Sequence, residues 1–158
     1  MSGKAAHAFQ PENHNIDDNW YWRLIRKTTL VELNKALDPV QQDLWGTTQF
    51  IGGSGINDRV IERNAPSFGY SLRLIDVTDL KVQVSVENPN FSNKKTVRGC
   101  FTYSGIKYAL VVTDPAVRSA YISRDKAIYP VGQAILCVSL GEPFNGYAYK
   151  LIAGVFLS

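Results

Sequence analysis

The order of the predicted strands in the second half of the chain constrains the fold more than any other feature. Leu80 to Val86 alternates apolar and polar residues, which is the period of a strand with one face in a core. Asn88-Pro89-Asn90 interrupts this run, and an extended segment resumes from Lys95 to Tyr103. Ser104-Gly105 then forms a two-residue connection to a third run, Ile106 to Thr113. These runs predict three antiparallel strands joined by hairpins.

The next elements begin with a helix signal. Asp114-Pro115 is typical of a helix start, because Asp accepts hydrogen bonds from free amides and proline fits the first helical position. We expect a short helix from Pro115 to about Tyr121. Ala134 to Leu140 is a near-continuous apolar run, which predicts a strand buried on both sides. A turn-rich linker from Gly141 to Gly146 precedes a last predicted strand, Tyr147 to Phe156.

Three strands, a helix and two strands between Ser71 and Phe156 predict a mainly β (α+β) fold. This order is that of an OB-like five-stranded barrel with a short helix between strands 3 and 4. The pattern leaves open a generic barrel or an SH3-like sheet that binds no polymer. We assign residues 70–158 to the predicted barrel.

Residues 1–69 are expected to form an N-terminal arm with a short helix and a Gly-rich loop, packed on the barrel. Thr29 and Glu32 have capping-box spacing, which predicts a helix from about Leu30 to Leu37, with Leu30, Leu33 and Leu37 on its packing face. Gly52-Gly53-Ser54-Gly55 lacks the Lys-Ser/Thr of a phosphate-binding loop, so we interpret it as a connector within a long loop that ends at Arg59.

Composition sets the outer limits. The 158 residues are 45% hydrophobic and 20% charged, as expected of one globular domain. Without a long apolar run or a secretory signal at Met1, the chain is expected to be cytoplasmic and not to bind membranes. Cys100 and Cys137 both fall in predicted strands, too few for a disulfide framework. No cofactor is expected.

Basic and aromatic residues mix on the second and third predicted strands. The net charge of +3 is only mildly basic, so their distribution matters more than the total. Single-stranded nucleic acid is held by cations that contact phosphates and by flat side chains that stack on bases. The candidate nucleic-acid-binding residues are Lys95, Arg98, Phe101, Tyr103, Lys107 and Tyr108. For each residue taken singly, a core aromatic or a solvated lysine is an equally good interpretation.

Catalytic signals are thin, and we assign no catalytic residue and no metal ligand. His7 and His14 are the only histidines, and their spacing suits no helical face. Cys137 lies in an apolar run without a visible activating base. A weaker enzymatic hypothesis is a nucleotide-processing site that uses the acidic residues Glu12, Asp17, Asp58 and Glu142.

Several segments carry a resemblance to a known family, and the block from Leu136 to Ala153 is the most specific. The others are Gln10 to Asn13, Tyr21-Trp22, Leu44-Trp45, Asn57 to Val60, Ser71 to Ile75 and Val112 to Pro115. In these segments the chain resembles the bacterial dual OB-containing domain family, over about Phe9 to Phe156. The resemblance implies OB-like units and a nucleic-acid or nucleotide role, sometimes in bacterial conflict systems. We therefore expect a non-catalytic module that binds single-stranded nucleic acid or a nucleotide.

The N-terminal side departs from the family pattern. Members place a strand-rich first half before the segment that begins at Gln10, whereas nine residues precede it here. We expect the first OB unit to be absent or supplied by another chain. An incomplete unit would expose aromatic surface, so we predict self-association or docking to a partner chain through Trp20, Tyr21 and Trp22. The alternative function is thus a protein-interaction subunit with the barrel as scaffold.

Overall fold

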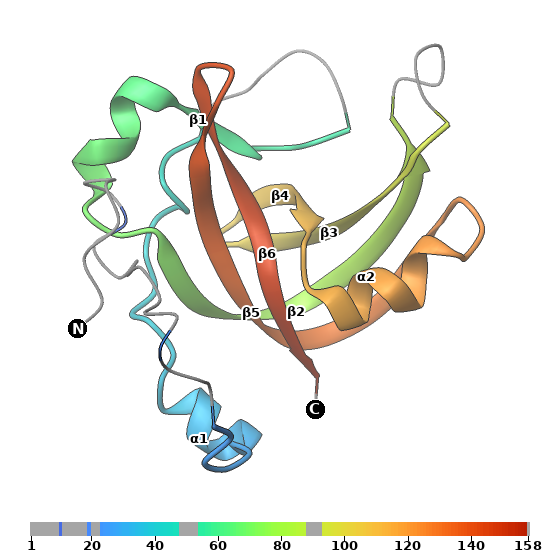
Figure 1. Cartoon of the computed structure of the whole chain (residues 1–158), viewed down its shortest axis with the longest axis horizontal. Coiled ribbons are helices and arrows are strands. Elements are labelled where there is room, and N and C mark those ends of the chain that lie inside the picture. The colour runs from blue at the N-terminus through green and yellow to red at the C-terminus, as the bar shows by residue number, and fades with distance from the viewer. Residues whose placement is uncertain (1–9, 11–18, 20–22, 48–53, 88–92, 158) are drawn as a thin grey trace.

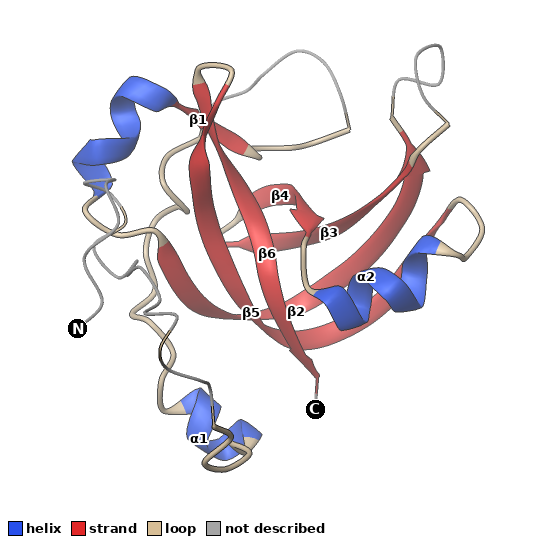
Figure 2. Ribbon diagram, in the orientation of Figure 1, coloured by secondary structure: helices blue, strands red, loops and turns tan. Residues whose placement is uncertain are grey.

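Five strands close into a ring, as Figures 1 and 2 show. The computed structural model describes residues 10, 19, 23–47, 54–87 and 93–157. The ring consists of β2 (Leu72–Val86), β3 (Lys95–Tyr103), β4 (Ile106–Val112), β5 (Ala127–Phe144) and β6 (Tyr147–Leu157). Its neighbours are antiparallel except for β4 and β6, which pair in parallel through Val111–Leu151 and Val112–Ile152. Helix α2 (Pro115–Ile122) lies between β4 and β5 in the chain, so the predicted OB-like barrel is confirmed.

Local turn and cap chemistry behaves as the sequence predicts. Ser104 and Gly105 have φ values of 49° and 78°, as a two-residue hairpin with a primed turn requires. Asn145 and Gly146 repeat this geometry with φ values of 51° and 82°. The Asp114 carboxylate accepts hydrogen bonds from two amides of the first turn of α2. The two turns thus define the β3–β4 and β5–β6 hairpins, and the Asp114 cap defines the start of α2.

The prediction for the fourth strand was too short. β5 continues past Leu140 to Phe144, and Pro143 pairs with Ala148, so the predicted linker is a strand except at Asn145-Gly146. A register shift between Leu140 and Pro143 allows this extension, because a bulge absorbs turn-forming residues without ending a strand.

The interior of the barrel is closely packed. On β3, a Cβ atom built at Gly99 would lie 2.3 Å from Ile152 Cδ1, so the side chain of Ile152 needs the space that glycine leaves. Helix α2 packs Val117, Tyr121 and Ile122 against the core.

The N-terminal helix is shorter than predicted. The Thr29 and Glu32 capping box is present, but α1 (Leu30–Asn34) ends before Leu37 and has no buried residue. Leu30, Leu33 and Leu37 are only half-buried. The sequence also did not predict β1 (Arg59–Ile61) or the 3₁₀ helix η1 (Glu62–Phe68).

The segment 38–46, here called the docking arm, lies between the first half of β2 and the β3–β4 hairpin. Asp38 and Leu74 exchange two hydrogen bonds, at 3.0 Å from the Asp38 amide and at 2.6 Å to its carboxylate. The Gln41 amide donates to the Tyr103 hydroxyl at 2.8 Å, and the Leu44 amide donates to the Tyr108 hydroxyl at 3.0 Å. The docking arm thus pairs with the backbone of β2 at Leu74, where β3 does not reach, and its own amides find acceptors in two tyrosine hydroxyls.

A second segment, 54–58, here called the strap, fills the opening between β4 and β6. Ile56 and Ala109 exchange both backbone hydrogen bonds, at 3.3 and 2.9 Å. The Lys150 amide donates to the Asp58 carbonyl at 2.8 Å, and β1 then pairs with β6. The sequence predicted a loop here, because the pairing partners are distant in sequence and the strap itself carries no strand pattern.

Replacing Tyr108 by Phe should lower the free energy of unfolding by about 1–3 kcal/mol, because the buried Leu44 amide would be deprived of its acceptor. Urea unfolding monitored by circular dichroism measures the change. Tyr149→Phe is the control, since no hydrogen bond of that hydroxyl is found within the described ranges. Equal stabilities of the two variants would contradict a docking role for Tyr108.

Candidate nucleic-acid interface

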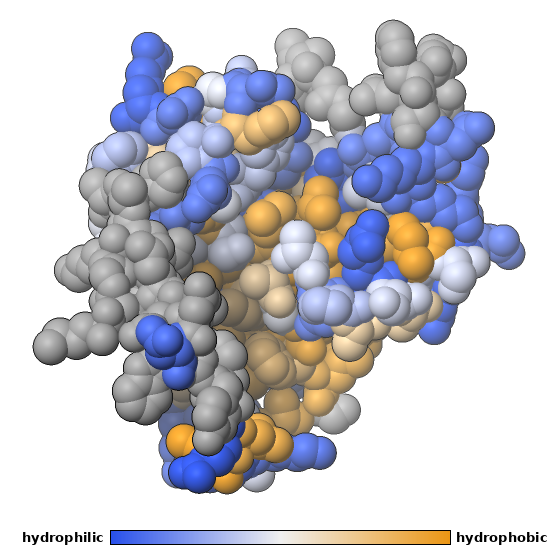
Figure 3. Space-filling view, viewed as in Figure 1, coloured by the Kyte–Doolittle hydropathy of each residue, from blue (hydrophilic) through white to orange (hydrophobic). Residues whose placement is uncertain are grey.

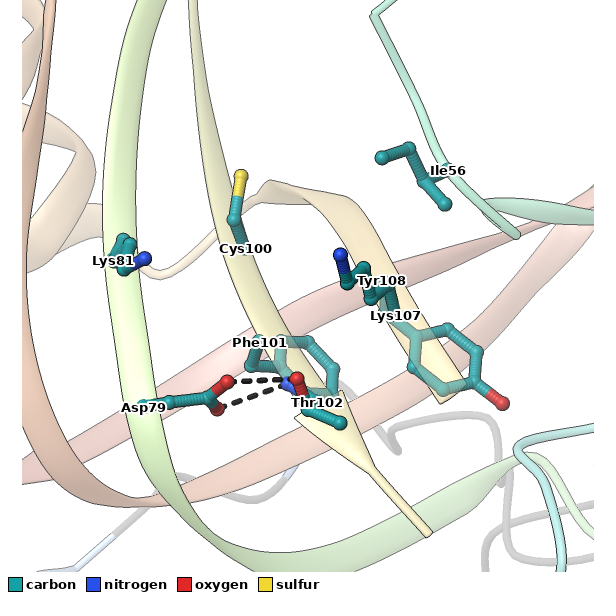
Figure 4. A pocket seen from close by; sticks show the side chains of 8 residues that line it. All are labelled: Ile56, Asp79, Lys81, Cys100, Phe101, Thr102, Lys107 and Tyr108. Carbon is teal, nitrogen blue, oxygen red and sulfur yellow. Dashed lines mark hydrogen bonds between the residues drawn. The ribbon is translucent and has the colours of Figure 1, made fainter. Parts of the chain in front are cut away.

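A pocket of about 190 Å³ lies on the outer face of β2, β3 and β4 (Figure 4). In the strand register Lys81 is opposite Cys100, and Thr102 is opposite Lys107, so these side chains are neighbours on one face of the sheet. The full lining is Ile56, Asp79, Lys81, Cys100, Phe101, Thr102, Lys107 and Tyr108. Ile56 belongs to the strap, so the N-terminal region forms one wall.

The charged groups of the pocket differ in their partners. The Asp79 carboxylate accepts hydrogen bonds from the Thr102 amide at 2.9 Å and from its hydroxyl at 2.7 Å. Burial opposes ionisation, but these bonds hold the pKa of Asp79 below its usual value. Lys81 and Lys107 are exposed, and in the part of the chain that the structure describes neither ammonium has a hydrogen-bond or ion-pair partner. The pocket therefore presents two cations and one fixed anion.

The structure separates the three predicted cations. Lys107 lies in the pocket, whereas the ammonium of Lys95 donates to the Arg124 carbonyl at 2.7 Å, beyond the C-terminal end of α2. Arg98 is buried beneath the strap.

The three predicted aromatic residues, Phe101, Tyr103 and Tyr108, lie in the core. Their exposed fractions are 3%, 6% and 1%, and the rings of Phe101 and Tyr108 stack at 5.5 Å. Alternation along β3 places Phe101 on the same inner face as Val97. A base cannot reach these rings, so the predicted stacking role does not fit the structure. Phe101 and Tyr108 contribute only to the floor of the pocket.

Arg98 is the centre of a buried ionic network. Its Nε atom donates to a Glu87 carboxylate oxygen at 2.6 Å and to the Ser54 hydroxyl at 3.2 Å. A terminal nitrogen lies 3.4 Å from Asp58 Oδ2 and donates to the Ala109 carbonyl at 3.2 Å. Arg98 therefore holds the strap on the barrel and does not present its guanidinium to a phosphate, which corrects its predicted role.

The strap approaches this network closely. A Cβ atom at Gly55 would lie 2.0 Å from Asp58 Oδ2, so only glycine fits beside the carboxylate without displacing it. Burial disfavours the ionised form of Glu87, but the hydrogen bonds from Arg98 and Ser54 outweigh this effect and lower the pKa of Glu87.

The turn of the β5–β6 hairpin carries three aromatic residues that reach the surface. Tyr147 and Tyr149 alternate with buried Ala148 and Lys150, which places both rings on the outer face. Phe144 is 66% exposed. Alternation along the predicted strand from Tyr147 to Phe156 could have shown these two outward rings, but they were not among the predicted site residues.

Lys150 points into the barrel and is 1% exposed. Its ammonium donates to the Gly46 carbonyl at 2.7 Å. Burial lowers the pKa of Lys150 to about 8, although the negative charges of Asp43 and Asp58 partly oppose this shift.

The other predicted chemical groups form no recognisable catalytic or metal site among the described residues. Asp58 is buried in ion pairs, and Glu142 lies on β5 close to the β5–β6 turn. The residues that the structure describes contain no group of three potential metal ligands. Cys100 and Cys137 are free thiols, and burial raises the pKa of both. The remaining candidate residues, Glu12, Asp17, Trp20, Tyr21 and Trp22, lie outside the described residues, as do His7 and His14, which were assigned to no site.

Comparison with known proteins shows the family to which the chain belongs. A family model described as "Dual OB-containing domain" matches residues 1–155. No curated protein and no solved structure matches the chain. The family suggests a nucleic-acid-binding or protein-binding module. Over the described ranges, no helix is long and apolar enough to cross a bilayer.

Replacing Arg98 by Met should lower the free energy of unfolding by about 3–5 kcal/mol, because Glu87 and Asp58 would be left without this partner in a poorly solvated site. Chemical denaturation measures the decrease. Arg118→Met, at an exposed position of α2, should change stability by less than about 0.5 kcal/mol. A similar small effect at Arg98 would show that the network contributes little.

Lys150 should make stability depend on pH in a defined direction. Between about pH 8 and the ordinary pKa of 10.5, the unfolded chain keeps the proton that folded Lys150 has released. The free energy of unfolding of the native protein should therefore rise with pH relative to Lys150→Met, by up to about 1.4 kcal/mol per pH unit.

Denaturation curves of both proteins across this range give the difference. Tyr108 and the two cysteines have raised pKa values and act in the opposite direction, but they are common to both proteins. A difference that is constant with pH would contradict the lowered pKa of Lys150.

Proposed function

Because the chain belongs to the dual OB-containing domain family, we propose that it is a non-catalytic module that binds single-stranded nucleic acid or a nucleotide. The proposed setting is the bacterial cytoplasm, in a defence or conflict system. The observation that carries the proposal is the presence of two ammonium groups, those of Lys81 and Lys107, in the pocket over β3 and β4, neither with a hydrogen-bond or ion-pair partner among the described residues. These strands correspond to strands 2 and 3 of an OB-fold, whose face binds oligonucleotides and oligosaccharides.

The pocket has the chemistry to distinguish a nucleotide from a simple anion. Lys81 and Lys107 can contact phosphate oxygens. Each Asp79 oxygen accepts a hydrogen bond from Thr102 and has a further lone pair for a sugar hydroxyl or a base amino group. Since the ionised Asp79 repels phosphate, a ligand with an anionic end and a donor end fits best.

The alternative is a protein-interaction subunit, and apolar surface near α1 supports it. Apolar side chains gather between α1 and the C-terminal end of β6 (Figure 3). Leu24, Ile25 and Val31 are 77%, 91% and 67% exposed, and a groove that includes Leu30, Ile135 and Phe156 lies beside them. Partner docking through Trp20, Tyr21 and Trp22 belongs to this alternative. Co-purification of a stoichiometric partner that survives nuclease and high salt would support it.

Labelled DNA and RNA single strands of about 12 nucleotides, within the site size of OB folds, test the main proposal. The native protein should bind at low salt, with an affinity that falls steeply as salt increases. Lys81→Ala with Lys107→Ala should weaken binding and lower the magnitude of the salt slope by about 0.7 for each phosphate that the variant no longer neutralises. Fluorescence anisotropy across a salt series measures both.

Lys27→Ala with Lys35→Ala is the matched control, because these lysines are exposed near α1, away from the pocket. Bound ligand should also protect Cys100, which lines the pocket, from alkylation at alkaline pH, with Cys137 as internal reference. Absence of binding at low salt, or an equal decrease in the control, would refute the proposal.

A further inference from the structure

The β5–β6 hairpin carries an aromatic surface that the pocket does not include. Phe144 and Tyr147 are opposite each other beside the Asn145-Gly146 turn, and Arg59 of β1 is opposite Tyr149. Opposite residues of antiparallel strands project to the same face, here the outer face of the barrel. We call Phe144, Tyr147, Tyr149 and Arg59 the hairpin platform.

The geometry of the hairpin platform suits flat ligands. The guanidinium carbon of Arg59 lies 4.9 Å from the centre of the Tyr149 ring and 5.7 Å from that of Tyr147. The Nε atom of Arg59 donates a hydrogen bond of 2.7 Å to the Asp58 carboxylate, which holds this guanidinium in place. Tyr147 and Tyr149 meet edge to face at 6.4 Å, and Phe144 exposes 66% of its surface at the end of β5. Aromatic rings and arginine planes are the groups on which unpaired bases stack.

The hairpin platform adjoins the cationic pocket through the strap. The side-chain amide of Asn57 donates to the Lys107 carbonyl at 2.9 Å, so the strap contacts the pocket strand directly. Arg59 follows two residues later, so its Cα atom lies at most about 7 Å from that of Asn57. Lys107, which can contact a phosphate, and the rings, which can stack on bases, therefore lie on neighbouring elements, as binding of a single strand requires.

We propose that unpaired bases of single-stranded nucleic acid stack on the hairpin platform while the adjoining phosphates contact Lys81 and Lys107. This inference rests on the proposed function of the pocket and adds the site for the bases. Phe144 and Tyr149 take the stacking role, in place of the buried rings of β3 and β4. The cation beside the rings and the continuity with Lys107 favour nucleic acid over an apolar protein surface.

Paired variants that keep or remove a ring test the stacking. Phe144→Leu and Tyr149→Leu remove aromatic faces, whereas Phe144→Trp and Tyr149→Phe keep them. The probes are an oligothymidylate and an abasic strand of equal length, which has the phosphates but no bases. Each Leu variant should bind oligothymidylate about 5- to 150-fold more weakly, since one stacked base contributes ~1–3 kcal/mol. The ring-keeping variants should bind within about twofold of the native protein.

The abasic strand separates the two proposals. The Leu variants should bind it as the native protein does, whereas Lys81→Ala with Lys107→Ala should weaken binding of both strands. Failure of the native protein to bind either strand would refute the proposed function itself. Binding of oligothymidylate that is unchanged in both Leu variants would overturn only the hairpin platform.

Light scattering of the same proteins tests whether these rings mediate self-association instead of base stacking. The native protein should have the same mass as Phe144→Leu at every concentration tested. A self-associated native protein that Phe144→Leu dissociates, with unchanged affinity for oligothymidylate, would show that the hairpin is a protein contact and would overturn the inference. Circular dichroism checks that each variant is folded, as expected at Phe144, which is mostly exposed.

Discussion

The buried guanidinium of Arg98 is the interaction on which the rest of this structure depends. It joins β3 to Glu87, which follows β2, and to Asp58 of the strap, which lies 40 residues from Arg98 in the sequence. Charges removed from water must be paired, so this network tolerates little displacement of the strap. The position of Asp58 in turn fixes Arg59 and, through its carbonyl, Lys150. The wall of the pocket and the hairpin platform therefore share one support.

Polar groups inside the barrel also bind the N-terminal region, here residues 38–58. The Tyr103 and Tyr108 hydroxyls accept hydrogen bonds from amides of the docking arm, and the Lys150 ammonium binds the Gly46 carbonyl. Buried polar groups need partners, and here the partners come from residues 38–58 rather than from the barrel strands. A barrel without this region would leave these groups unsatisfied and its β2 and β4 edges open. The N-terminal region is thus an integral part of the barrel.

The sequence predicted those features that depend on neighbouring residues. Strand order, the Ser104-Gly105 turn and the Asp114 cap follow from chemistry within a few positions, and all are present. Pairing of the strap with β4 and β6 depends on partners about 50 and 90 residues away, for which no local pattern exists. Among the site residues, Lys107 was predicted and is exposed. Lys81 was missed, because a lysine at an alternating polar position looks like any solvated residue.

The residues of β3 alternate between two faces, and the burial pattern shows which face is the inner one. Val97, Phe101 and Tyr103 share the more apolar face, and this face is buried in the core. Arg98 lies on the opposite face, so the predicted rings and Arg98 cannot belong to one binding surface. If nucleic acid binds to the outer face, neither the phosphate contacts nor the stacking would distinguish one base sequence from another. Asp79, held by Thr102, is then the fixed acceptor of the pocket, and it is the group that can distinguish one nucleotide from another.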